Sequence, residues 1–402
     1  ISIEGDSAIG HVRYSTAGDQ RNENIQPLIA NTSLGKVAIA HNGNITNSRI
    51  LKRELTKKGQ IFQSTTDTEF ILSLLSLNNK DSIEERFIDF SPKLEGAYSL
   101  LIMKSNKLIA IRDPFGFRPL VIGKYNKSFI ITSETCALDM IGAKYIRDVE
   151  PGEIVSVSKK GLESRKLKTE NKKEKFCVFE FIYFMRPNSS FQNNSVSDIR
   201  EKIGSELAKE NNIDADVVIP VPDSGIHAAI GFSEASKIPF KQGIIRSHYM
   251  GRTFIEPKIV TRNLNVNMKL SINKIYVKNK KVVLIDDSIV RGTNMKKIVS
   301  MVKNAGAKEI HVRIASPPFI NPCYYGIDTP TKKELIASTK SLRSLTNFFN
   351  CDTLKYISVD GLFRAIYNGQ KLKKEKRYCD ACFTGNYFFP RHLDTLRNKN
   401  HK

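Results

Sequence analysis

Short alternating runs of hydrophobic and polar residues, separated by turn-forming residues, fill the first part of the chain, residues 1–165. Alternation of this kind is typical of half-buried β-strands. The clearest runs lie at residues 37–40, 98–103 and 109–111. Residues 47–58 and 67–77 instead carry the start signals and apolar spacing that are typical of helices. This part of the chain is therefore predicted to form a layered α+β sandwich.

The pattern changes in residues 177–402, where apolar runs alternate with amphipathic stretches. Residues 216–219 and 282–285 are apolar runs that predict buried parallel strands, and residues 196–210 predict a helix. A second helix is predicted after the run at 282–285, with Gly306 at its C-cap. Its predicted buried face consists of Ile298, Val299, Met301, Val302 and Ala305. Alternating strands and helices predict an α/β domain with a parallel sheet.

Residues 166–176 are mostly charged and have no apolar period, which predicts a linker between the two domains. With 402 residues, 40% of them apolar, the chain is long enough for two domains with sizeable cores. It has no apolar run of membrane-spanning length and no signal-peptide pattern, so a cytoplasmic enzyme is expected. The chain begins with Ile1 rather than Met, and we expect it to be a fragment or a processed product.

The formal charge of +22 raises the question of an acidic partner. Basic residues are dispersed along the chain, there is no Trp, and no aromatic residues are interleaved with basic clusters. Nucleic-acid binding is therefore not expected.

The stretch from Val282 to Asn294 is the most informative in the chain. Its apolar run ends in two carboxylates, Asp286 and Asp287, and a short polar loop then opens a helix. Ligands of open α/β sheets bind at the carboxyl ends of strands, and the amides of a helix N-terminus hold a phosphate. Adjacent acids suit sugar hydroxyls or Mg²⁺ better than a bare phosphate. The loop residues that would hold the phosphate are Ser288, Arg291, Gly292 and Thr293.

A solvated turn explains the two acids taken alone, but the whole stretch resembles the 5-phosphoribosyl 1-diphosphate (PRPP) motif of type I phosphoribosyltransferases. The turn after residues 216–219 resembles the diphosphate loop of the same family. Its prolines fix the backbone, while Asp223, Ser224 and Gly225 can turn hydroxyl and amide groups toward a diphosphate. The resemblance implies that Asp286, Asp287 and Ser224 hold Mg²⁺.

Residues 246–255 form a basic segment between these two motifs. A solvated basic loop is one explanation. The other is a loop that folds over a polyanionic substrate, with Arg252 as a phosphate ligand and Tyr249 beside it. The order of residues resembles such a loop in glutamine PRPP amidotransferases.

Three polar clusters in the first domain supply the groups that would bind an α-amino acid and polarise its side-chain amide. Arg13 offers a guanidinium for a carboxylate, Asn42 and Gly43 offer an oxyanion hole, and Asp67 offers an acid for an ammonium group. Each also has a simpler explanation: a surface ion pair, a hairpin turn and a helix N-cap.

These clusters are followed by the segments 96–98, 112–120 and 133–135, and their order resembles the N-terminal-nucleophile (Ntn) glutaminase domain of class II glutamine amidotransferases. The resemblance implies an α/β/β/α sandwich in which Arg13 and Asp67 bind glutamine and Asn42 and Gly43 form the oxyanion hole. The nucleophile of that family is an N-terminal cysteine, and no cysteine precedes Cys136 here. Cys136 has no free α-amine and is expected in the core. As written, the sequence is expected to use ammonia and not to hydrolyse glutamine.

Four further cysteines lie among aromatic and apolar residues, at Cys177, Cys323, Cys379 and Cys382. Their spacing alone leaves Zn²⁺, an iron–sulfur cluster and no metal as open alternatives. The surrounding strings resemble the iron–sulfur, Bacillus-like branch of the amidophosphoribosyltransferases. That resemblance implies a 4Fe–4S cluster that stabilises the fold and takes no part in redox chemistry. Cys351 is left unassigned.

The resemblance to amidophosphoribosyltransferases covers residues 9–385. It implies synthesis of 5-phosphoribosylamine, glutamate and diphosphate from PRPP, glutamine and water in purine biosynthesis. It also implies Mg²⁺, feedback inhibition by purine nucleotides and a homotetramer. The alternatives are a non-catalytic PRPP-binding regulator and another class II amidotransferase, which would lack Asp286 and Asp287.

Overall fold

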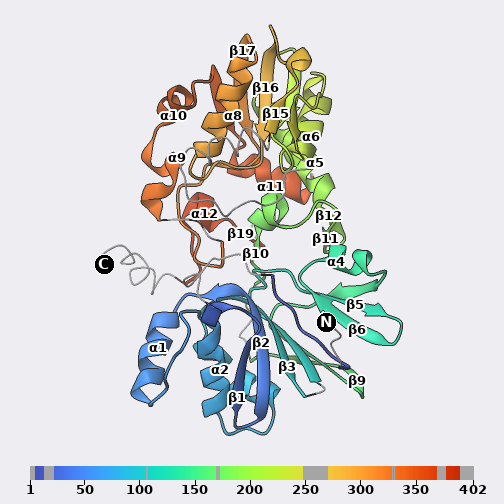
Figure 1. Cartoon of the computed structure of the whole chain (residues 1–402), viewed down its shortest axis with the longest axis vertical. Helices are drawn as coiled ribbons and strands as arrows, with labels where there is room; N and C mark the ends of the chain where they lie inside the picture. Colours follow the sequence, from blue (N-terminus) through green and yellow to red (C-terminus); the bar gives the residue numbers. More distant parts are fainter. Residues whose placement is uncertain are drawn as a thin grey trace.

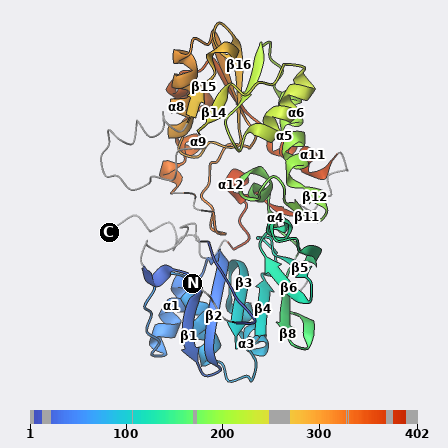
Figure 2. The ribbon, with the colours of Figure 1, turned by 45° about the vertical axis from the view of Figure 1, so that its right-hand side comes forward.

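The computed structural model describes residues 5–12, 22–105, 107–168, 173–247, 270–327, 329, 331–368 and 377–389. In these residues the chain forms two bodies stacked along the long axis of the molecule (Figure 1). The first body contains the N-terminal residues, drawn in blue to green, and the second contains the later residues. A view turned by 45° shows the same separation (Figure 2).

The main sheet of the first body has antiparallel strands in the order β1-β2-β3-β4-β8-β9. Its strands are β1 (Leu28–Thr32), β2 (Gly35–Ile45), β3 (Gly96–Lys104), β4 (Lys107–Arg112), β8 (Glu153–Ser158) and β9 (Gly161–Lys166). One face is covered by three helices, whose apolar side chains share a core with the sheet. They are α1 (Ser48–Lys57), α2 (Thr68–Leu77) and α3 (Ile83–Phe90).

A second sheet, in the order β6-β5-β7, packs on the opposite face. Its strands are β5 (Val121–Tyr125), β6 (Ser128–Thr132) and β7 (Lys144–Asp148). Ala110 of the main sheet and Ile122 of the second sheet belong to one buried cluster. The helix α4 (Thr135–Met140) packs on the outer side of the second sheet through Leu138, and Cys136 in this helix is buried as predicted. The layers are therefore helix, sheet, sheet and helix.

The second body contains a parallel sheet in the order β13-β16-β17-β18. The strands are β13 (Val217–Pro220), β16 (Lys281–Asp286), β17 (Glu309–Ile314) and β18 (Thr353–Tyr356). Side chains alternate along β16, so that Val283 faces one cluster while Val282 and Leu284 face the other. Helices α5 (Val196–Glu210), α6 (Ile226–Ser236) and α11 (Val359–Tyr367) cover the first face. Helices α8 (Thr293–Asn304) and α10 (Leu342–Phe349) cover the second.

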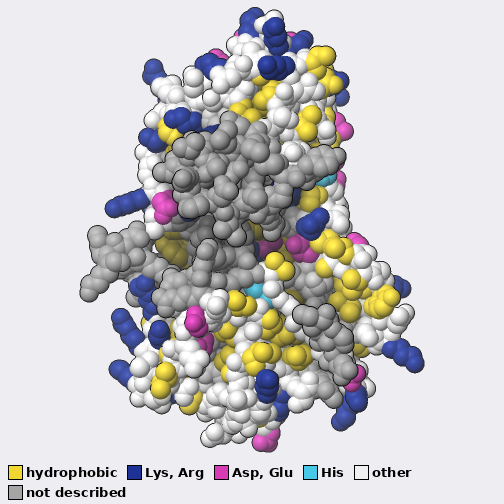
Figure 3. Space-filling view, in the orientation of Figure 1, with side chains coloured by type: hydrophobic (Ala, Val, Ile, Leu, Met, Phe, Trp, Pro, Cys, Tyr) yellow, Lys and Arg dark blue, Asp and Glu magenta, His cyan; other side chains and the backbone are white. Residues whose placement is uncertain are grey.

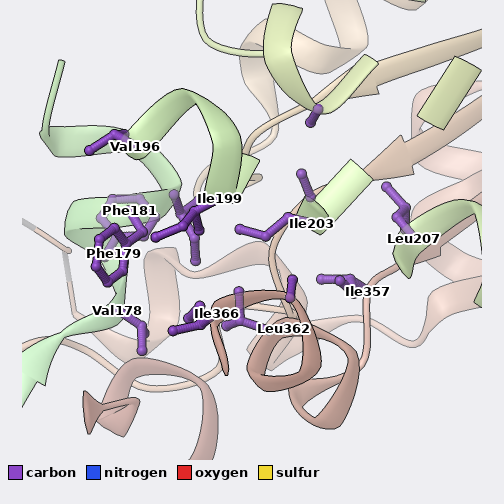
Figure 4. Close-up of a cluster of buried hydrophobic side chains, with 14 of the residues drawn as sticks. Val178, Phe179, Phe181, Val196, Ile199, Ile203, Leu207, Ile357, Leu362 and Ile366 are labelled. Carbon is purple, nitrogen blue, oxygen red and sulfur yellow. The ribbon is translucent and has the colours of Figure 1, made fainter. Parts of the chain in front are cut away.

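The larger of these clusters extends from the sheet toward the first body. Figure 4 shows Ile199 and Ile203 of α5 lying close to Leu362 and Ile366 of α11, with Phe181 beside them. Phe181 belongs to η3 (Glu180–Phe184), a turn of π-helix. The core of the second body therefore includes η3, which precedes α5 in the chain.

Short elements lie between the two bodies. The strand β10 (Phe176–Cys177) pairs in parallel with β19 (Tyr378–Cys379), and α12 (Ala381–Thr384) follows β19. Both ribbon views place α12 between the bodies (Figures 1 and 2). Phe117 of the first body stacks on Tyr325 of the second, with ring centroids 4.5 Å apart.

The remaining described elements are short. They are β11 (Ser190–Phe191), β12 (Asn194–Ser195), β14 (Ile244–Arg246), β15 (Leu270–Ile272), α9 (Ile336–Thr339), η1 (Asn22–Asn24), η2 (Ser91–Lys93), η4 (Lys274–Tyr276) and η5 (Lys332–Glu334).

The predicted helices at 47–58, 67–77 and 196–210 are confirmed as α1, α2 and α5. The predicted strands are also present, and 37–40 proves to be part of an eleven-residue strand, β2. One core prediction was wrong. Met301 is only half-buried, whereas Ile298, Val299, Val302 and Ala305 are buried as predicted and are joined by Met295. The positions of the domain boundaries stay predictions.

Lysine and arginine side chains are scattered over both bodies on the face shown in Figure 3, in agreement with their dispersal along the sequence. Within the described residues, no helix has both the length and the apolar character needed to span a bilayer.

Candidate functional site

Two loops meet at the carboxyl ends of β13 and β16. The strands pair in register from Val217 and Val282 to Pro220 and Ile285, so both end at the same edge of the sheet. The Val221 amide donates to the Ile285 carbonyl, 2.8 Å away, and extends the pairing into the loops. Ser224 and Asp287 line the same small pocket, and the Ser224 hydroxyl favours the ionised form of the Asp287 carboxyl. The structure thus brings together two motifs that are about 60 residues apart in the sequence.

Asp286 and Asp287 are held by short local hydrogen bonds. The Asp287 amide donates to Asp286 Oδ1 at 3.0 Å, and the Ser288 hydroxyl donates to Asp287 Oδ2 at 2.5 Å. Burial and the neighbouring Asp287 charge raise the pKa of Asp286 well above its usual value. Burial also raises the pKa of Asp287, although the Ser224 and Ser288 hydroxyls oppose the shift. The carboxyl groups of the half-buried Asp286 and the buried Asp287 lie side by side, which favours a shared proton or a bound cation.

A buried cation that the sequence analysis did not identify lies behind this pair. Arg200 of α5 is 4% exposed, and its charge stabilises the ionised form of Asp287. Its Nε and Nη2 donate to the carbonyls of Phe181 and Met185, both at 2.7 Å. Arg200, Ser224 and Asp287 line one small pocket. An arginine in the middle of a helix carries no sequence signal for this role, because only the packing of α5 brings it to the site.

The helix α8 begins where a phosphate-binding helix is expected. Gly292 is its N-cap residue, with a φ of 77° that favours glycine, and Thr293 is the first helical residue. No side chain caps the first turn. Arg291 is exposed, and its Nε pairs with Glu334 Oε2 at 3.2 Å. In this structure the Arg291 guanidinium therefore forms an ion pair with η5.

The predicted diphosphate loop is tied to the segment that precedes residues 248–269. Asp223 Oδ2 accepts a hydrogen bond from Arg246 Nη1 at 2.6 Å, and both side chains are more than half exposed. Arg246 ends β14. Tyr249 and Arg252, which the sequence analysis assigned to the PRPP site, lie outside the described residues.

The predicted glutamine site lies at one end of β2. Asn42 and Gly43 are within this strand and pair with Ser99 and Tyr98, so they are not the tip of a hairpin. Gly43 has a φ of 150°, and a Cβ atom there would lie 2.1 Å from the Ala97 carbonyl oxygen. Only glycine fits this position.

Asp67 occupies the N-cap position of α2, but its side chain does not cap the helix. Its Oδ2 accepts from the Ile45 amide at 2.7 Å, and its Oδ1 lies 3.5 Å from His41 Nδ1. Burial raises the pKa of Asp67, but His41 and the Ile45 amide outweigh burial and hold it below its usual value. A buried carboxylate kept in its charged form suits an ammonium ligand. His41 was missed although it precedes Asn42, and Arg13 lies outside the described residues.

Three chain segments bring the four predicted cluster cysteines together. Cys177 and Cys379 are direct partners in the β10–β19 pair, Cys382 lies in α12, and Cys323 follows β17. All four thiols are free, and burial raises the pKa of each, that of Cys177 to about 12. Cys177 and Cys382 belong to one buried cluster and Cys379 to another, and Cys323 packs against both. No three metal-binding side chains in the described residues are close enough to share a single ion.

Two protein-family models match separate parts of the chain. A model described as a glutamine amidotransferase domain matches residues 11–140. A model described as a phosphoribosyl transferase domain matches residues 189–316.

Three relatives described as amidophosphoribosyltransferases match almost the whole chain. The protein from Rhizobium etli is 46% identical and covers 96% of this chain and 79% of its own length. The protein from Methanocaldococcus jannaschii is 47% identical, with coverages of 96% and 84%. The protein from Bacillus subtilis is 44% identical, with coverages of 98% and 83%.

A solved structure shows the same fold. The glutamine PRPP amidotransferase from B. subtilis, in complex with ADP and GMP, superposes with a TM-score of 0.87 at 44% identity. The match covers 94% of this chain and 82% of that one. The predicted combination of a glutaminase fold with a phosphoribosyltransferase fold is confirmed. The chain therefore belongs to the amidophosphoribosyltransferase family, the enzymes that start purine biosynthesis from PRPP and glutamine.

Proposed function

We propose that the second body catalyses the attack of ammonia on C1 of PRPP. The C1–N bond forms as the bond from C1 to the diphosphate oxygen breaks, and the nitrogen loses a proton to give 5-phosphoribosylamine. The observation that carries this proposal is the small pocket that Ser224 and Asp287 line together, where the loops after two adjacent parallel strands meet.

The proposed roles follow from the chemistry of this reaction. Its transition state has the character of an oxocarbenium ion, so the site must orient the sugar and hold the leaving diphosphate. Asp286 and Asp287 accept hydrogen bonds from the ribose hydroxyls. The N-terminus of α8 holds the 5-phosphate with Ser288, Arg291, Gly292 and Thr293. The diphosphate is held by Asp223, Ser224 and Gly225, and from outside the described residues by Tyr249 and Arg252.

Mg²⁺ is the proposed cation of this site, with Ser224, Asp286 and Asp287 as the groups that hold it directly or through water. The raised pKa of Asp286 supports this, because a cation relieves the repulsion between two adjacent carboxylates. When bound, Mg²⁺ neutralises part of the charge of the leaving diphosphate.

For the first body we propose that Asp67 binds the ammonium group of glutamine and that Asn42 and Gly43 form the oxyanion hole. Arg13 is the proposed partner of the glutamine carboxylate. The buried, ionised Asp67 and the close packing at Gly43 support these roles.

The four cysteines are proposed to hold a 4Fe–4S cluster. The donor set fits this group, because three buried thiols and the half-buried Cys323 come from three segments and pack in two clusters that Cys323 joins. A cluster of four irons is wider than a single ion, so its cysteine ligands stand further apart than those of a mononuclear site. The raised pKa values mean that the thiols are neutral without metal and release protons when they bind it. The proposed role is structural.

Purine nucleotides are proposed to regulate the chain. The support is the solved B. subtilis structure, which is a complex with ADP and GMP. The homotetramer and the cytoplasmic location stay predictions.

The test of the transferase site is release of diphosphate from PRPP with ammonium as the nitrogen donor, because ammonium does not require the glutaminase site. We expect Asp287→Asn to lower this rate at least about 100-fold, the loss typical of a charge-stabilising group in an active site. Asp352→Asn is the matched control. Its carboxylate accepts from the Ile310 amide at the opposite edge of the same sheet, near the first residues of β17 and β18.

An equal rate in Asp287→Asn and in wild type would refute the assignment. Binding of PRPP without any turnover would instead support the non-catalytic regulator.

A further inference from the structure

Arg118 connects the two bodies at a point that the proposed mechanism does not use. It lies in the loop between β4 and β5 and is 4% exposed. Its Nη1 donates to Glu180 Oε1 of η3, and its Nη2 donates to the Gly326 carbonyl, both at 2.5 Å. The side chains of Arg118 and Glu180 are each only 5% exposed. One guanidinium of the first body therefore holds two separate segments of the second.

The remaining donor of this guanidinium, the Nε–H group, has no hydrogen-bond acceptor among the described residues. Arg118 Nε is buried and makes no hydrogen bond with any described residue. One face of the guanidinium lies 5.2 Å from the centre of the Phe184 ring, so that face is closed to water. A buried N–H without an acceptor is destabilising, because no hydrogen bond offsets the loss of its contact with water. We therefore expect the Arg118 Nε–H group to have an acceptor when the site is complete.

Two of the cluster cysteines belong to the segments next to Arg118. The Cys177 amide donates to the carbonyl of Phe117, the residue before Arg118, at 3.1 Å, and Cys323 lies three residues before Gly326. Burial would lower the pKa of Arg118, but Glu180, Cys177 and Cys323 outweigh it and raise the pKa above its usual value. No other charged group has a larger effect on this guanidinium. A deprotonated sulfur at Cys177 or Cys323 is the acceptor that the site offers.

The same guanidinium sits against the proposed oxyanion hole. A Cβ atom at Gly326 would lie 3.0 Å from both Cα and C of Gly43 and 3.2 Å from Arg118 Nη2. The neighbouring Asn44 Nδ2 donates to the Tyr324 carbonyl at 2.8 Å. Residues 323–326 thus run from a cluster cysteine to the strand that carries Gly43.

We propose that Arg118 is a positioning residue that donates a hydrogen bond from the first body to the sulfur ligands of the cluster. Through this contact it holds the cluster in a fixed position relative to β2, the strand that contains Asn42 and Gly43. This inference rests on the proposed 4Fe–4S cofactor. Four thiolates give such a cluster a net negative charge, and hydrogen bonds to the sulfurs are a principal means by which a protein stabilises it and sets its potential. Arg118 supplies both a buried positive charge and an unused N–H group.

The test is iron and sulfide content, and the rate of iron loss to a chelator, in the full chain purified without oxygen. We expect Arg118→Met to lose iron about 10- to 100-fold faster than wild type, the effect of removing a hydrogen bond to a charged group. Arg118→Lys keeps the charge but not the Nε–H. It should retain the iron and show a shifted reduction potential.

Arg147→Met is the matched control. Arg147 also pairs with a buried glutamate, Glu153, at 2.7 Å, but no cysteine is among the charges that act on it. We expect its iron content and loss rate to equal those of wild type.

A second measurement, amide hydrogen exchange, tests whether Arg118 and the cluster stabilise β2. In Arg118→Met, amide hydrogen exchange in the peptide that contains Gly43 and Asn44 should rise, and it should rise in wild type stripped of iron as well.

Equal loss rates and potentials in wild type, Arg118→Met and Arg118→Lys would overturn the role of Arg118 while leaving the cluster in place. Wild type without iron and sulfide would overturn the cofactor itself, and the role of Arg118 with it. If Arg118→Met does not fold, the reduction potential of Arg118→Lys tests the proposal. A potential equal to that of wild type would refute the hydrogen bond from Arg118 Nε to a cluster sulfur.

Discussion

Replacing Glu180 by glutamine tests whether the ion pair between the two bodies is fully removed from water. The carboxylate lies 2.5 Å from Arg118 Nη1, and both side chains are 5% exposed. Removing one partner of a buried pair costs about 3–5 kcal/mol, because the remaining charge is left uncompensated. The glutamine amide oxygen can still accept one hydrogen bond, which recovers about 1 kcal/mol. We therefore expect Glu180→Gln to lower the free energy of unfolding by about 2–4 kcal/mol.

The assay is urea denaturation followed by far-UV circular dichroism. With an m-value of about 3 kcal/mol/M, the expected loss moves the midpoint by roughly 1 M. Glu334→Gln is the control, because the Arg291–Glu334 pair is about half exposed and such pairs contribute about 0–1 kcal/mol. A midpoint shift no larger than that of the control would refute the reasoning, since it would mean that water reaches Arg118.

Three further predictions concern the cysteines, a buried acid and the glutamine site. Cys379→Ser should lose bound iron and Cys351→Ser should keep it, as measured by iron content per chain. Burial raises the pKa of Asp113 to about 6, so its contribution to stability is present below its unfolded pKa and is lost as pH rises through about 6. Wild type should thus lose about 2 kcal/mol from this group between pH 4 and 7, and an equal pH slope in Asp113→Asn would contradict this. Gly43→Ala should destabilise the chain by about 1–3 kcal/mol, because the added Cβ atom would overlap the Ala97 carbonyl. Gly10→Ala is the control, since a Cβ atom there meets open space. Equal thermal midpoints for the two variants would refute the packing argument.

Local sequence was sufficient wherever the chemistry lies in one contiguous stretch. The apolar run ending in Asp286 and Asp287 became β16 and its loop, and α8 begins after Gly292 as the pattern predicts. Strand and helix periodicity predicted both layered bodies, because the two periods, 2 and 3.6, differ enough to be read directly. Met301 shows the limit of this reasoning, because it lies at the margin of the apolar face.

The function of single residues was less predictable. Asp67 looked like a helix cap, yet its carboxylate binds the Ile45 amide of another strand. Asn42 and Gly43 looked like a turn, yet they continue β2. Arg13, Tyr249 and Arg252 lie outside the described residues, so their roles stay predictions.

The sequence by itself determined which segments form strands and helices and the order of the two domains, and it predicted a chemistry for each motif. These properties depend on residues near one another in the chain. Only the tertiary structure decided that Ser224 meets Asp287, that Arg200 lies behind them, and that Arg118 joins Glu180 to Gly326. Such contacts join residues far apart in the chain, and their strength comes from burial, which exists only after the helices and sheets have packed together.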